Sequence, residues 1–364
     1  MSLLTVADYE ALARERLPRE HYDYYAGGAG DEVTIGANRR AFDAIALHPR
    51  VLVNVARVDT SVRVLDTELP LPVLLAPTAF NRLAHPDGEE AAARGAARAG
   101  TVMVASTFST CSVEAIAAAA TAPLWMQVYI FKDRAVTIDL IARAEAAGYR
   151  AIVLTVDTPV LGRRDRDVRN AFTLPEGMTL RNFESPGAQA RWQSSGMPFA
   201  AWVHDLIDPS LTWEAVEWLR ARTRLPIVLK GVLSPEDAHL AADAGVDGII
   251  VSNHGGRQLD GAAAAITVLP SITDAVAGRT AVLMDGGVRR GGDVLKALAL
   301  GARAVLIGRA YLWGLAVGGE EGVADVLRLL REELAVAMAL TGRPSVAAID
   351  RTVVEPDSRP RAAV

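Results

Sequence analysis

The segment at residues 252–260, with the sequence SNHGGRQLD, places a histidine and an arginine three residues apart. It directly follows an apolar run at residues 248–251 that has the character of a strand. The imidazole of His254 can accept a proton, and the Arg257 guanidinium can hold a carboxylate with two hydrogen bonds. The pair therefore indicates chemistry on a small acid. The alternative is a loop in which His254 caps a backbone group and Arg257 is solvated.

Polar residues also stand at or just after the ends of most other apolar runs. In a barrel of parallel strands, the carboxyl ends of all strands meet at one mouth, which is where reacting groups lie. The strand-end residues are Ser106, Gln127, Tyr129, Thr155, Asp157, Lys230, Ser252, His254, Asp285 and Arg309. Convergence from so many strands predicts a single shared site.

Lys230 ends an apolar run, where a buried ammonium must find a partner or lose its proton. It could form a Schiff base, as in aldolases, or stabilise negative charge on a cofactor ring. The donors and acceptors of Ser106, Gln127 and Thr155 suit the edge of a heterocycle and favour the cofactor role. Asp157 could orient the imidazole of His254, or it could simply make a turn.

Two glycine-containing strand ends have the composition of a phosphate site. They are the DGGVRR sequence at residues 285–290, with Gly287 and Arg289, and the IGR sequence at 307–309, with Gly308 and Arg309. Glycine lets backbone N–H groups approach an anion, and arginine adds charge-assisted hydrogen bonds. A phosphorylated ligand is therefore expected.

The elements that must position these residues follow one rhythm, a short apolar run and then a longer amphipathic, alanine-rich stretch. Eight such units predict a closed (β/α)8 TIM barrel of class α/β, whereas an open doubly wound sheet would carry a glycine-rich turn after its first strand. The predicted strands are 72–76, 102–106, 124–129, 151–155, 226–230, 248–252, 281–285 and 304–307.

The chain is predicted to be one domain over 1–364, with a helical N-terminal extension (1–70), the barrel (71–345) and a tail (346–364). Amphipathic stretches at 6–15 and 37–47 predict that the extension is helical and covers one end of the barrel. The sequence SPED at 234–237 is typical of a helix start, and 322–341 has the spacing of a packed helix. The connection at 162–208 is long enough to predict a lid, although a disordered insertion is the alternative.

The 364 residues are 51% hydrophobic and 22% charged with a formal charge of −5, which describes a globular protein. The scattered Lys and Arg give no nucleic-acid footprint, and nothing favours a membrane surface. Cys111 is the only cysteine, so an internal disulfide is excluded. Because residues 1–20 lack the apolar core of a signal peptide and no run approaches the ~20 apolar residues of a membrane span, a cytoplasmic location is expected.

The assembled motifs resemble the FMN-dependent 2-hydroxy-acid oxidase and dehydrogenase family. That family includes glycolate oxidase, lactate oxidase, mandelate dehydrogenase and the flavin domain of flavocytochrome b2. The resemblance covers nearly the whole chain. It rests on 22–28 (YDYYAGG), 75–79 (LAPTA), 127–129 (QVY), 154–159 (LTVDTP), 161–164 (LGRR), 229–232 (LKGV), 252–260 and 285–290.

The resemblance implies that FMN lies across the barrel mouth, with no metal at the site. Lys230 would stabilise negative charge near N1 of the flavin. The residues implied around the ring system are Pro77, Thr78, Ala79, Ser106, Gln127, Thr155, Lys230 and Ser252. Asp285 would face the ribityl chain, and the phosphate would meet Gly287, Arg289, Gly308 and Arg309.

The resemblance also implies roles around the substrate, an (S)-2-hydroxy acid oxidised to the 2-oxo acid with O2 reduced to hydrogen peroxide. His254 would take the hydroxyl proton with Asp157 behind it, and Tyr129 would hydrogen-bond the reacting oxygen. The carboxylate would be held by Arg164, Arg257 and the Tyr24 hydroxyl. The family resemblance further suggests a homotetramer or homo-octamer.

Phe108 stands where similar glycolate oxidases have tryptophan, near the variable end of the substrate. The smaller ring favours lactate, longer aliphatic acids or aryl acids such as mandelate over glycolate. Ala79 is what the oxidases have, whereas mandelate dehydrogenases have glycine. Three other activities stay open: a dehydrogenase that uses a quinone or cytochrome, a lactate monooxygenase, and a lyase that forms a Schiff base at Lys230. A barrel that only binds a phosphorylated metabolite is the non-enzymatic alternative.

Overall fold

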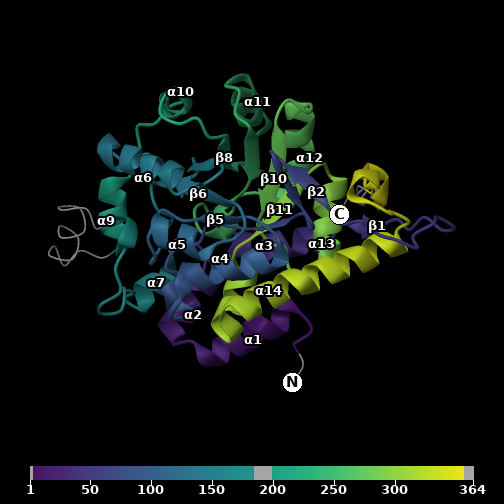
Figure 1. Cartoon of the computed structure of the whole chain (residues 1–364), viewed down its shortest axis with the longest axis horizontal. Coiled ribbons are helices and arrows are strands. Elements are labelled where there is room, and N and C mark those ends of the chain that lie inside the picture. The colour runs from purple at the N-terminus through teal and green to yellow at the C-terminus, as the bar shows by residue number, and fades with distance from the viewer. Residues whose placement is uncertain (1–2, 184–198, 356–364) are drawn as a thin grey trace, which may run out of the picture.

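The computed structural model describes residues 3–183 and 199–355, and eight of its strands close into a parallel barrel (Figure 1). Around the barrel the order is β10-β11-β4-β5-β6-β7-β8-β9. All eight predicted strands are confirmed. Their bounds are β4 (Val73–Leu75), β5 (Met103–Ala105), β6 (Leu124–Val128), β7 (Ile152–Thr155), β8 (Ile227–Val232), β9 (Gly248–Val251), β10 (Ala281–Asp285) and β11 (Ala304–Ile307).

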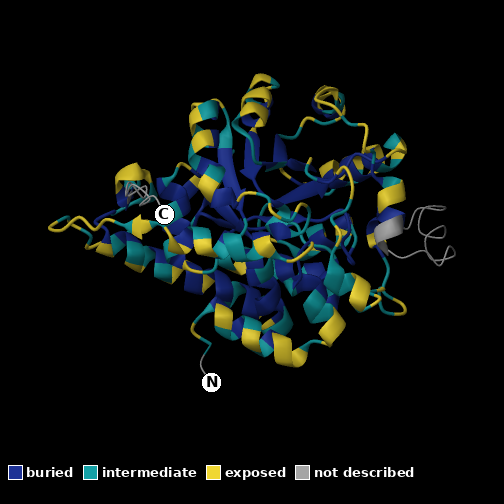
Figure 2. Cartoon of the chain, turned by 180° about the vertical axis from the view of Figure 1, so that it is seen from behind, coloured by how far each residue is buried: buried dark blue, intermediate teal, exposed yellow. Residues whose placement is uncertain are grey.

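The strands read as apolar runs because both of their faces are buried. Every residue of β7 is buried, with Val153 in the cluster that fills the barrel interior and Ile152 and Leu154 in the cluster beneath the helices. Figure 2 shows the same division, with buried strands inside and exposed faces on the outer helices. A parallel sheet covered on both sides gives continuous apolar runs rather than alternation.

Helices follow the strands and cover the barrel. Ser234 Oγ accepts a hydrogen bond from the Asp237 amide at 3.0 Å and Pro235 is the first helical residue, so the predicted helix start is confirmed. The covering helices are α4 (Gly88–Ala99), α5 (Val113–Ala119), α6 (Arg134–Ala146), α10 (Glu214–Arg220), α11 (Pro235–Asp243), α12 (Ala265–Val276), α13 (Gly291–Ala299) and α14 (Arg309–Leu340). The backbone of α14 is non-helical at Gly318 and Gly319, which explains why only its second half was predicted, from residue 322.

The N-terminal extension is helical only as far as α3. Its helices are α1 (Val6–Arg16), α2 (Arg19–Ala26) and α3 (Val33–Asp43). The helix predicted over 37–47 is α3, so both of its predicted bounds were wrong. It ends before Ala46 because β1 (Ala46–Leu47) pairs with β12 (Val354–Glu355), and this pairing also orders part of the tail. A hairpin of β2 (Val62–Val64) and β3 (Thr67–Leu69) follows. The prediction that the whole extension is helical was therefore wrong for its second part.

The extension contributes to both ends of the barrel, not to one as predicted. Val62, Val64 and Leu69 of the hairpin pack into the cluster that fills the barrel interior. Helices α2 and α3 instead reach the carboxyl ends of the strands, where Tyr24 and Asn38 line a pocket. One end of the barrel is thus closed by apolar packing, and the other holds a cavity.

The connection at residues 162–208 carries short helices of its own. They are α7 (Asp165–Arg169), a 3-10 turn at Arg181–Phe183 and α9 (Phe199–Leu206). Helix α10 follows the connection and begins at Glu214. Trp202 is buried, whereas residues 184–198 and the side chain of Phe199 lie outside the described residues.

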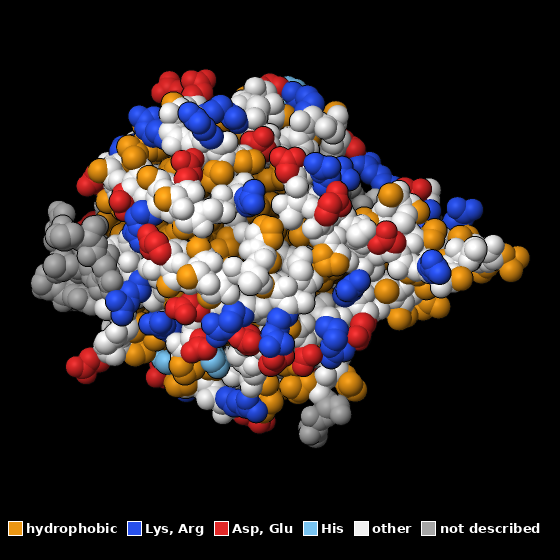
Figure 3. Space-filling model, viewed as in Figure 1, with side chains coloured by type: hydrophobic (Ala, Val, Ile, Leu, Met, Phe, Trp, Pro, Cys, Tyr) orange, Lys and Arg blue, Asp and Glu red, His pale blue; other side chains and the backbone are white. Residues whose placement is uncertain are grey.

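The surface carries mixed charge. On the face in Figure 3, Lys and Arg side chains are interspersed with Asp and Glu. Within the described residues no helix is long and apolar enough to cross a membrane. Cys111 is buried just before α5, and burial together with the charge of Glu89 raises its thiol pKa to about 12, as expected of an inert side chain.

Candidate active site

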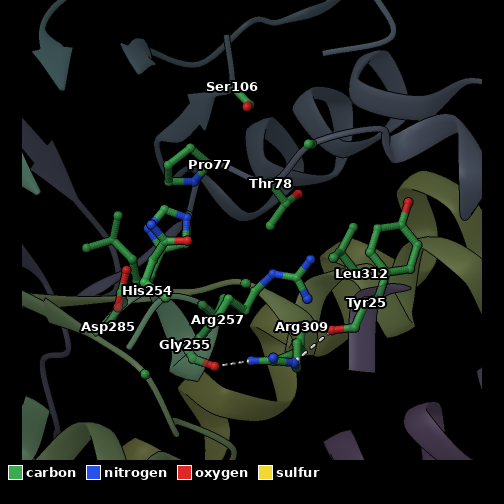
Figure 4. Close-up of a pocket in the computed structure, with 18 of the residues that line it drawn as sticks. Tyr25, Pro77, Thr78, Ser106, His254, Gly255, Arg257, Asp285, Arg309 and Leu312 are labelled. Carbon is green, nitrogen blue, oxygen red and sulfur yellow. Dashed lines mark hydrogen bonds between the residues drawn. The ribbon is translucent and has the colours of Figure 1, made fainter. Parts of the chain in front are cut away.

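A pocket lies at the carboxyl ends of the barrel strands and encloses about 1380 Å³ of space, including its opening to solvent. Figure 4 shows His254, Arg257 and Asp285 around this space. The predicted residues that line the pocket are Tyr24, Pro77, Thr78, Ala79, Ser106, Phe108, Gln127, Tyr129, Thr155, Arg164, Lys230, His254, Arg257, Asp285, Gly287, Arg289, Gly308 and Arg309. Asp157 and Ser252 stand behind this lining and contact residues of it.

His254 is held in one orientation from behind. Its Nδ1 lies 2.9 Å from Asp157 Oδ1. Because an ionised carboxylate only accepts hydrogen bonds, Nδ1 carries the proton and Nε2 is left as an acceptor. Burial raises the pKa of Asp157, but the charge and hydrogen bond of His254 and the charge of Lys230 outweigh it, so the net pKa lies below its ordinary value. The carboxylate is therefore ionised when it supports the imidazole.

The backbone around His254 is unusual. His254 has φ of 57°, in the left-handed region that a residue with a Cβ rarely adopts. The amide of His254 donates to Ser252 Oγ at 3.0 Å, which fixes the turn. Gly231 has φ of 113°, and a Cβ there would lie 2.5 Å from the Cβ of Asp157. Backbone strain of this kind concentrates at functional sites.

Lys230 has two polar partners, Asp285 in the pocket lining and Ser252 behind it. Its Nζ lies 3.1 Å from Asp285 Oδ2 and donates to Ser252 Oγ at 3.0 Å. Burial lowers the pKa of Lys230, but the charges of Asp285 and Asp157 outweigh burial and raise it above the ordinary value. A Schiff base requires a neutral amine, so this environment opposes the lyase alternative. A fixed positive charge suits the stabilisation of negative charge.

Arg257 is anchored by backbone oxygens. Its Nη1 donates to the carbonyls of Tyr24 and Gly27 at 2.7 and 2.8 Å, and no partner of Nε or Nη2 is found in the described part of the chain, so both can bind a ligand. Burial and the nearby charge of Arg164 lower the pKa of Arg257 to about 10. Both guanidinium groups lie over the Tyr24 ring, at 5.0 Å for Arg257 and 5.8 Å for Arg164. Arg164 Nη1 also lies 3.4 Å from Asp167 Oδ2, so one carboxylate already partners the two guanidinium groups, and their remaining positive charge favours an anionic ligand.

An aromatic wall bounds another side of the pocket. The ring of Phe108 lies 5.4 Å from that of Tyr129, and both residues are buried. Burial, together with the charge of Asp157, raises the pKa of Tyr129 far above its ordinary value. Tyr129 therefore keeps its proton at any working pH and can donate a hydrogen bond to a reacting oxygen.

Comparison with known proteins identifies the group of enzymes to which this geometry belongs. The family model described as FMN-dependent dehydrogenase matches residues 13–356. The chain belongs to the FMN-dependent dehydrogenase family. It is 48% identical to glycolate oxidase 3 of Arabidopsis thaliana over 98% of this chain and 97% of that protein. It is 47% identical to the peroxisomal (S)-2-hydroxyacid oxidase of the same plant, over 98% and 97% of the two chains.

Solved structures superpose closely on this FMN-dependent dehydrogenase. Mandelate oxidase with (S)-4-hydroxymandelic acid matches at a TM-score of 0.91 and 47% identity, over 97% of this chain and 98% of that one. Mandelate oxidase with benzoyl-formic acid matches at a TM-score of 0.88 and 46% identity over the same shares. The predicted family, fold class, FMN cofactor and oxidoreductase activity are thus confirmed.

The described residues fit FMN as the cofactor of this FMN-dependent dehydrogenase. Among them, Asp285 Oδ1 and Arg289 Nη1 are buried without a hydrogen-bond partner, as expected of groups that bind a polyol and a phosphate. Arg289 Nη1 does lie 3.3 Å from the Glu10 carboxylate, an ion pair at the edge of this region. Burial, together with repulsion from Arg257 and Arg289, lowers the pKa of Arg309 to about 9. A phosphate would neutralise this cluster of positive charge.

The glycine loop also fits a phosphate. Gly287 has φ of 91°, and a Cβ there would come within 2.5 Å of the Asn38 carbonyl oxygen. Arg309 also has a structural role that the sequence did not indicate. Its guanidinium donates to the carbonyls of Tyr25 and Gly255 (Figure 4) and to that of Gly27, at 2.8 to 2.9 Å. It lines the pocket and also ties the N-terminal extension to the loop after β9.

A polar network supports the place expected for the flavin ring. Gln127 Nε2 donates to Thr155 Oγ1 at 3.0 Å, and Gln127 Oε1 accepts from the Thr107 amide at 3.0 Å. Gln127 is therefore held in one amide orientation. Thr78, at another strand end, is hydrogen-bonded to Tyr311. Side chains fixed in this way can read the edge of a heterocycle.

Sequence reasoning missed an amide pair beside His254. Asn253 Nδ2 donates to Asn38 Oδ1 at 2.7 Å, and Asn38 Nδ2 donates back to Asn253 Oδ1 at 3.0 Å. The two residues are 215 positions apart. Asn253 stands inside the motif of residues 252–260, but no local pattern connects it with Asn38. Other lining residues that were not predicted include Tyr25, Ile35, Arg39, Leu161, Gln258, Val288 and Leu312.

Proposed function

We propose that this protein oxidises (S)-2-hydroxy acids with aryl or longer aliphatic side chains to 2-oxo acids, with O2 as the electron acceptor and hydrogen peroxide as the second product. The main supporting observation is that His254, backed by Asp157, faces the same pocket as Arg257 and the wall of Phe108 and Tyr129. Relatives named glycolate oxidase, (S)-2-hydroxyacid oxidase and mandelate oxidase support this choice.

The substrate is held by its carboxylate. Arg257 offers Nε and Nη2 because its Nη1 is committed to backbone oxygens, and Arg164 adds a second cation over the Tyr24 ring. Two guanidinium groups around one carboxylate fix both its position and its plane. The hydroxyl-bearing carbon is then directed toward His254 and Tyr129.

Proton removal falls to His254. Its Nε2 accepts the substrate hydroxyl proton, and the imidazolium that forms is stabilised by the ionised Asp157. The Tyr129 hydroxyl donates a hydrogen bond to the same substrate oxygen as it becomes a carbonyl oxygen. Residues 77–79, Gln127 and Lys230 would hold FMN, which when bound supplies the acceptor for the two electrons that leave the substrate carbon.

Phe108 favours 2-hydroxy acids with larger side chains as substrates. It lies next to Tyr129 at the pocket wall, on the side where we place the substituent of the reacting carbon. An aromatic face contributes favourable contact to an aryl or alkyl group and nothing to glycolate, which lacks one. We therefore expect mandelate and 2-hydroxyoctanoate to exceed glycolate in kcat/KM.

Anaerobic mixing of the purified protein with (S)-mandelate, (S)-2-hydroxyoctanoate, (S)-lactate and glycolate tests the proposal. We expect flavin absorbance to bleach with the larger acids and to return rapidly on admission of air, with stoichiometric peroxide. Slow return despite fast bleaching would reject O2 as the acceptor in favour of a quinone or cytochrome. Release of a decarboxylated acid without peroxide would indicate a monooxygenase.

Replacing Phe108 by tryptophan tests the substrate range separately. The larger indole fills the side-chain space, so kcat/KM for mandelate should fall about 10-fold or more while that for glycolate holds or rises. Equal changes for the two acids would remove Phe108 from substrate selection. The homotetramer or homo-octamer and the cytoplasmic location stay predictions, of which sedimentation velocity tests the first.

A further inference from the structure

Asn182 is a buried amide in the long connection between β7 and α10, and its side-chain bonds within the described residues all reach one distant segment. Its Oδ1 accepts from the Val113 amide at 3.0 Å. Its Nδ2 donates to the carbonyl oxygens of Thr107 and Ser106 at 3.1 and 3.4 Å. Ser106 and Thr107 lie in the segment that joins β5 to α5 and carries Phe108, and Val113 is the residue at which α5 begins.

An amide suits this position because one side chain must both accept and donate. Val113 is the first residue of α5, so its N–H has no partner within the helix. The Thr107 carbonyl lies in a buried turn, where an unsatisfied oxygen is costly. Aspartate could accept from Val113 but would set a carboxylate against two carbonyl oxygens.

A second anchor holds the backbone of Asn182. Arg143 Nη1 donates to the Asn182 carbonyl oxygen at 3.1 Å. Arg143 also donates two hydrogen bonds to the Glu114 carboxylate of α5, from Nε at 2.7 Å and from Nη2 at 3.0 Å. The side chain and the main chain of Asn182 are thus tied to the start of the same helix.

The residue after Asn182 supports the substrate wall. The Phe183 ring stacks on Phe108 with centroids 5.8 Å apart and planes at 18°, and it meets Trp202 edge to face at 5.5 Å. Phe183 is 2% exposed and is not part of the pocket lining, so it backs Phe108. The spacing of the two rings depends on how the connection packs against the β5–α5 segment, which the bonds of Asn182 hold together.

We propose that Asn182 is a positioning residue for substrate selection, which holds Phe183 behind Phe108 and so fixes the wall that meets the substrate side chain. The inference rests on the proposed function, since it concerns the substrate range of the same site. The proposal predicts that substitution of Asn182 lowers kcat/KM for acids that carry a side chain. The kcat/KM for glycolate should change little, because glycolate makes no contact with that wall.

The test compares kcat/KM for (S)-mandelate and glycolate in Asn182→Ala holoenzyme with matched FMN content. We expect the mandelate-to-glycolate ratio to fall about 10-fold, with glycolate within about 3-fold of the unaltered enzyme. Phe183→Leu should lower the ratio similarly, and the double variant should add little, because both changes act through the position of Phe108. Equal losses for both acids, or an unchanged ratio, would overturn the proposal.

The matched control is Asn170→Ala, another amide of the same connection, which bonds Asp23 of α2 at 2.9 Å. It should change both acids by the same factor, and a shift in the ratio like that of Asn182→Ala would overturn the special role of Asn182. If Asn182→Ala does not retain FMN, Arg143→Gln removes the backbone anchor while keeping the Asn182 side chain, and it should lower the ratio in the same direction. An unchanged ratio in folded Arg143→Gln then overturns the proposal.

The inference also has a readout that needs no turnover, which separates its failure from that of the proposed function. Near-ultraviolet circular dichroism reports the packing of the aromatic cluster. Asn182→Ala should change that spectrum in the same way as Phe183→Leu, whereas Asn170→Ala should leave it unchanged. An unaltered spectrum in folded Asn182→Ala would overturn the positioning role, while failure of the unaltered enzyme to oxidise any acid overturns the proposed function.

Discussion

The pocket has two halves that are built in different ways. The half expected to hold FMN consists of residues at strand ends, such as Gln127, Lys230 and Asp285. The half expected to hold the substrate comes largely from segments outside the strands, with Tyr24 on α2 of the N-terminal extension and Phe108 in the segment before α5. The strands of the barrel place most of the first half, whereas the second depends more on packing between distant segments.

This difference separates chemistry common to all 2-hydroxy acids from the choice among them. Strand ends are fixed by the hydrogen-bond ladders of the barrel, so their side chains are placed precisely enough for shared chemistry. Segments between strands can change in length and packing without disturbing the barrel. The comparison predicts that variants of the cofactor half affect all substrates alike, and that variants of the substrate wall affect them unequally.

The largest effect is expected at His254, where the two halves meet. His254→Ala removes the proton acceptor, so the rate of substrate-driven flavin bleaching should fall by about 10²- to 10⁴-fold while the yellow cofactor is retained. Stopped-flow absorbance under anaerobic conditions measures this rate. His239→Ala, at an exposed histidine, is the control and should bleach normally. Bleaching at the normal rate in His254→Ala would remove His254 from its role.

Next comes the buried ion pair of the cofactor half. Lys230→Met leaves Asp285 buried without its cation, which should lower the free energy of unfolding by about 3–5 kcal/mol and weaken FMN retention. Chemical denaturation followed by flavin fluorescence measures both. Lys296→Met removes a lysine that donates to the Phe42 carbonyl, and it should cost less. Equal losses in the two variants would contradict the importance of the pair.

A smaller effect is expected at Arg257, which together with Arg164 is proposed to hold the substrate carboxylate. Arg257→Lys replaces a fork by a point charge and loses the paired bonds to the Tyr24 and Gly27 carbonyls, so KM should rise about 10- to 100-fold for every acid tested. Steady-state kinetics with mandelate and glycolate check it. A rise for one acid alone would show that Arg257 selects side chains, against the proposed division. Arg222→Lys, on an exposed turn, should leave KM unchanged.

The smallest effect concerns the outer anchor of the substrate half. The hydrogen bond from Arg143 lowers the pKa of Glu114 to about 2, from an ordinary value of 4.5. Because the folded pKa lies below the unfolded one, the pair stabilises the protein above pH 4.5 and loses this effect as the pH falls toward 2. Glu114→Gln should therefore lower Tm by no more than about 2 °C at pH 6, and by progressively less below pH 4.5. A Tm difference independent of pH would contradict this account.

The barrel could be predicted because each of its strands is an apolar run buried on both faces and its crossover helices carry start signals such as Ser234 and Pro235. The errors fall in the extension. Ala46 and Leu47 continue a helical pattern of apolar residues, yet they form a strand because their partners come from the other end of the chain, at residues 354 and 355. A pairing of that separation leaves no local signal.

The residues of the site likewise fall into those that local sequence could predict and those that it could not. Local sequence determined the chemistry of His254, Lys230 and the glycine loops, because a residue at a strand end has its place set by its own strand and by the closure of the barrel. Only the tertiary structure decided that Asn38 pairs with Asn253 and that Asn182 ties Phe183 to Phe108, because these contacts join segments that are distant in the chain. Long-range packing depends on all the elements between two residues, and no window of sequence contains it.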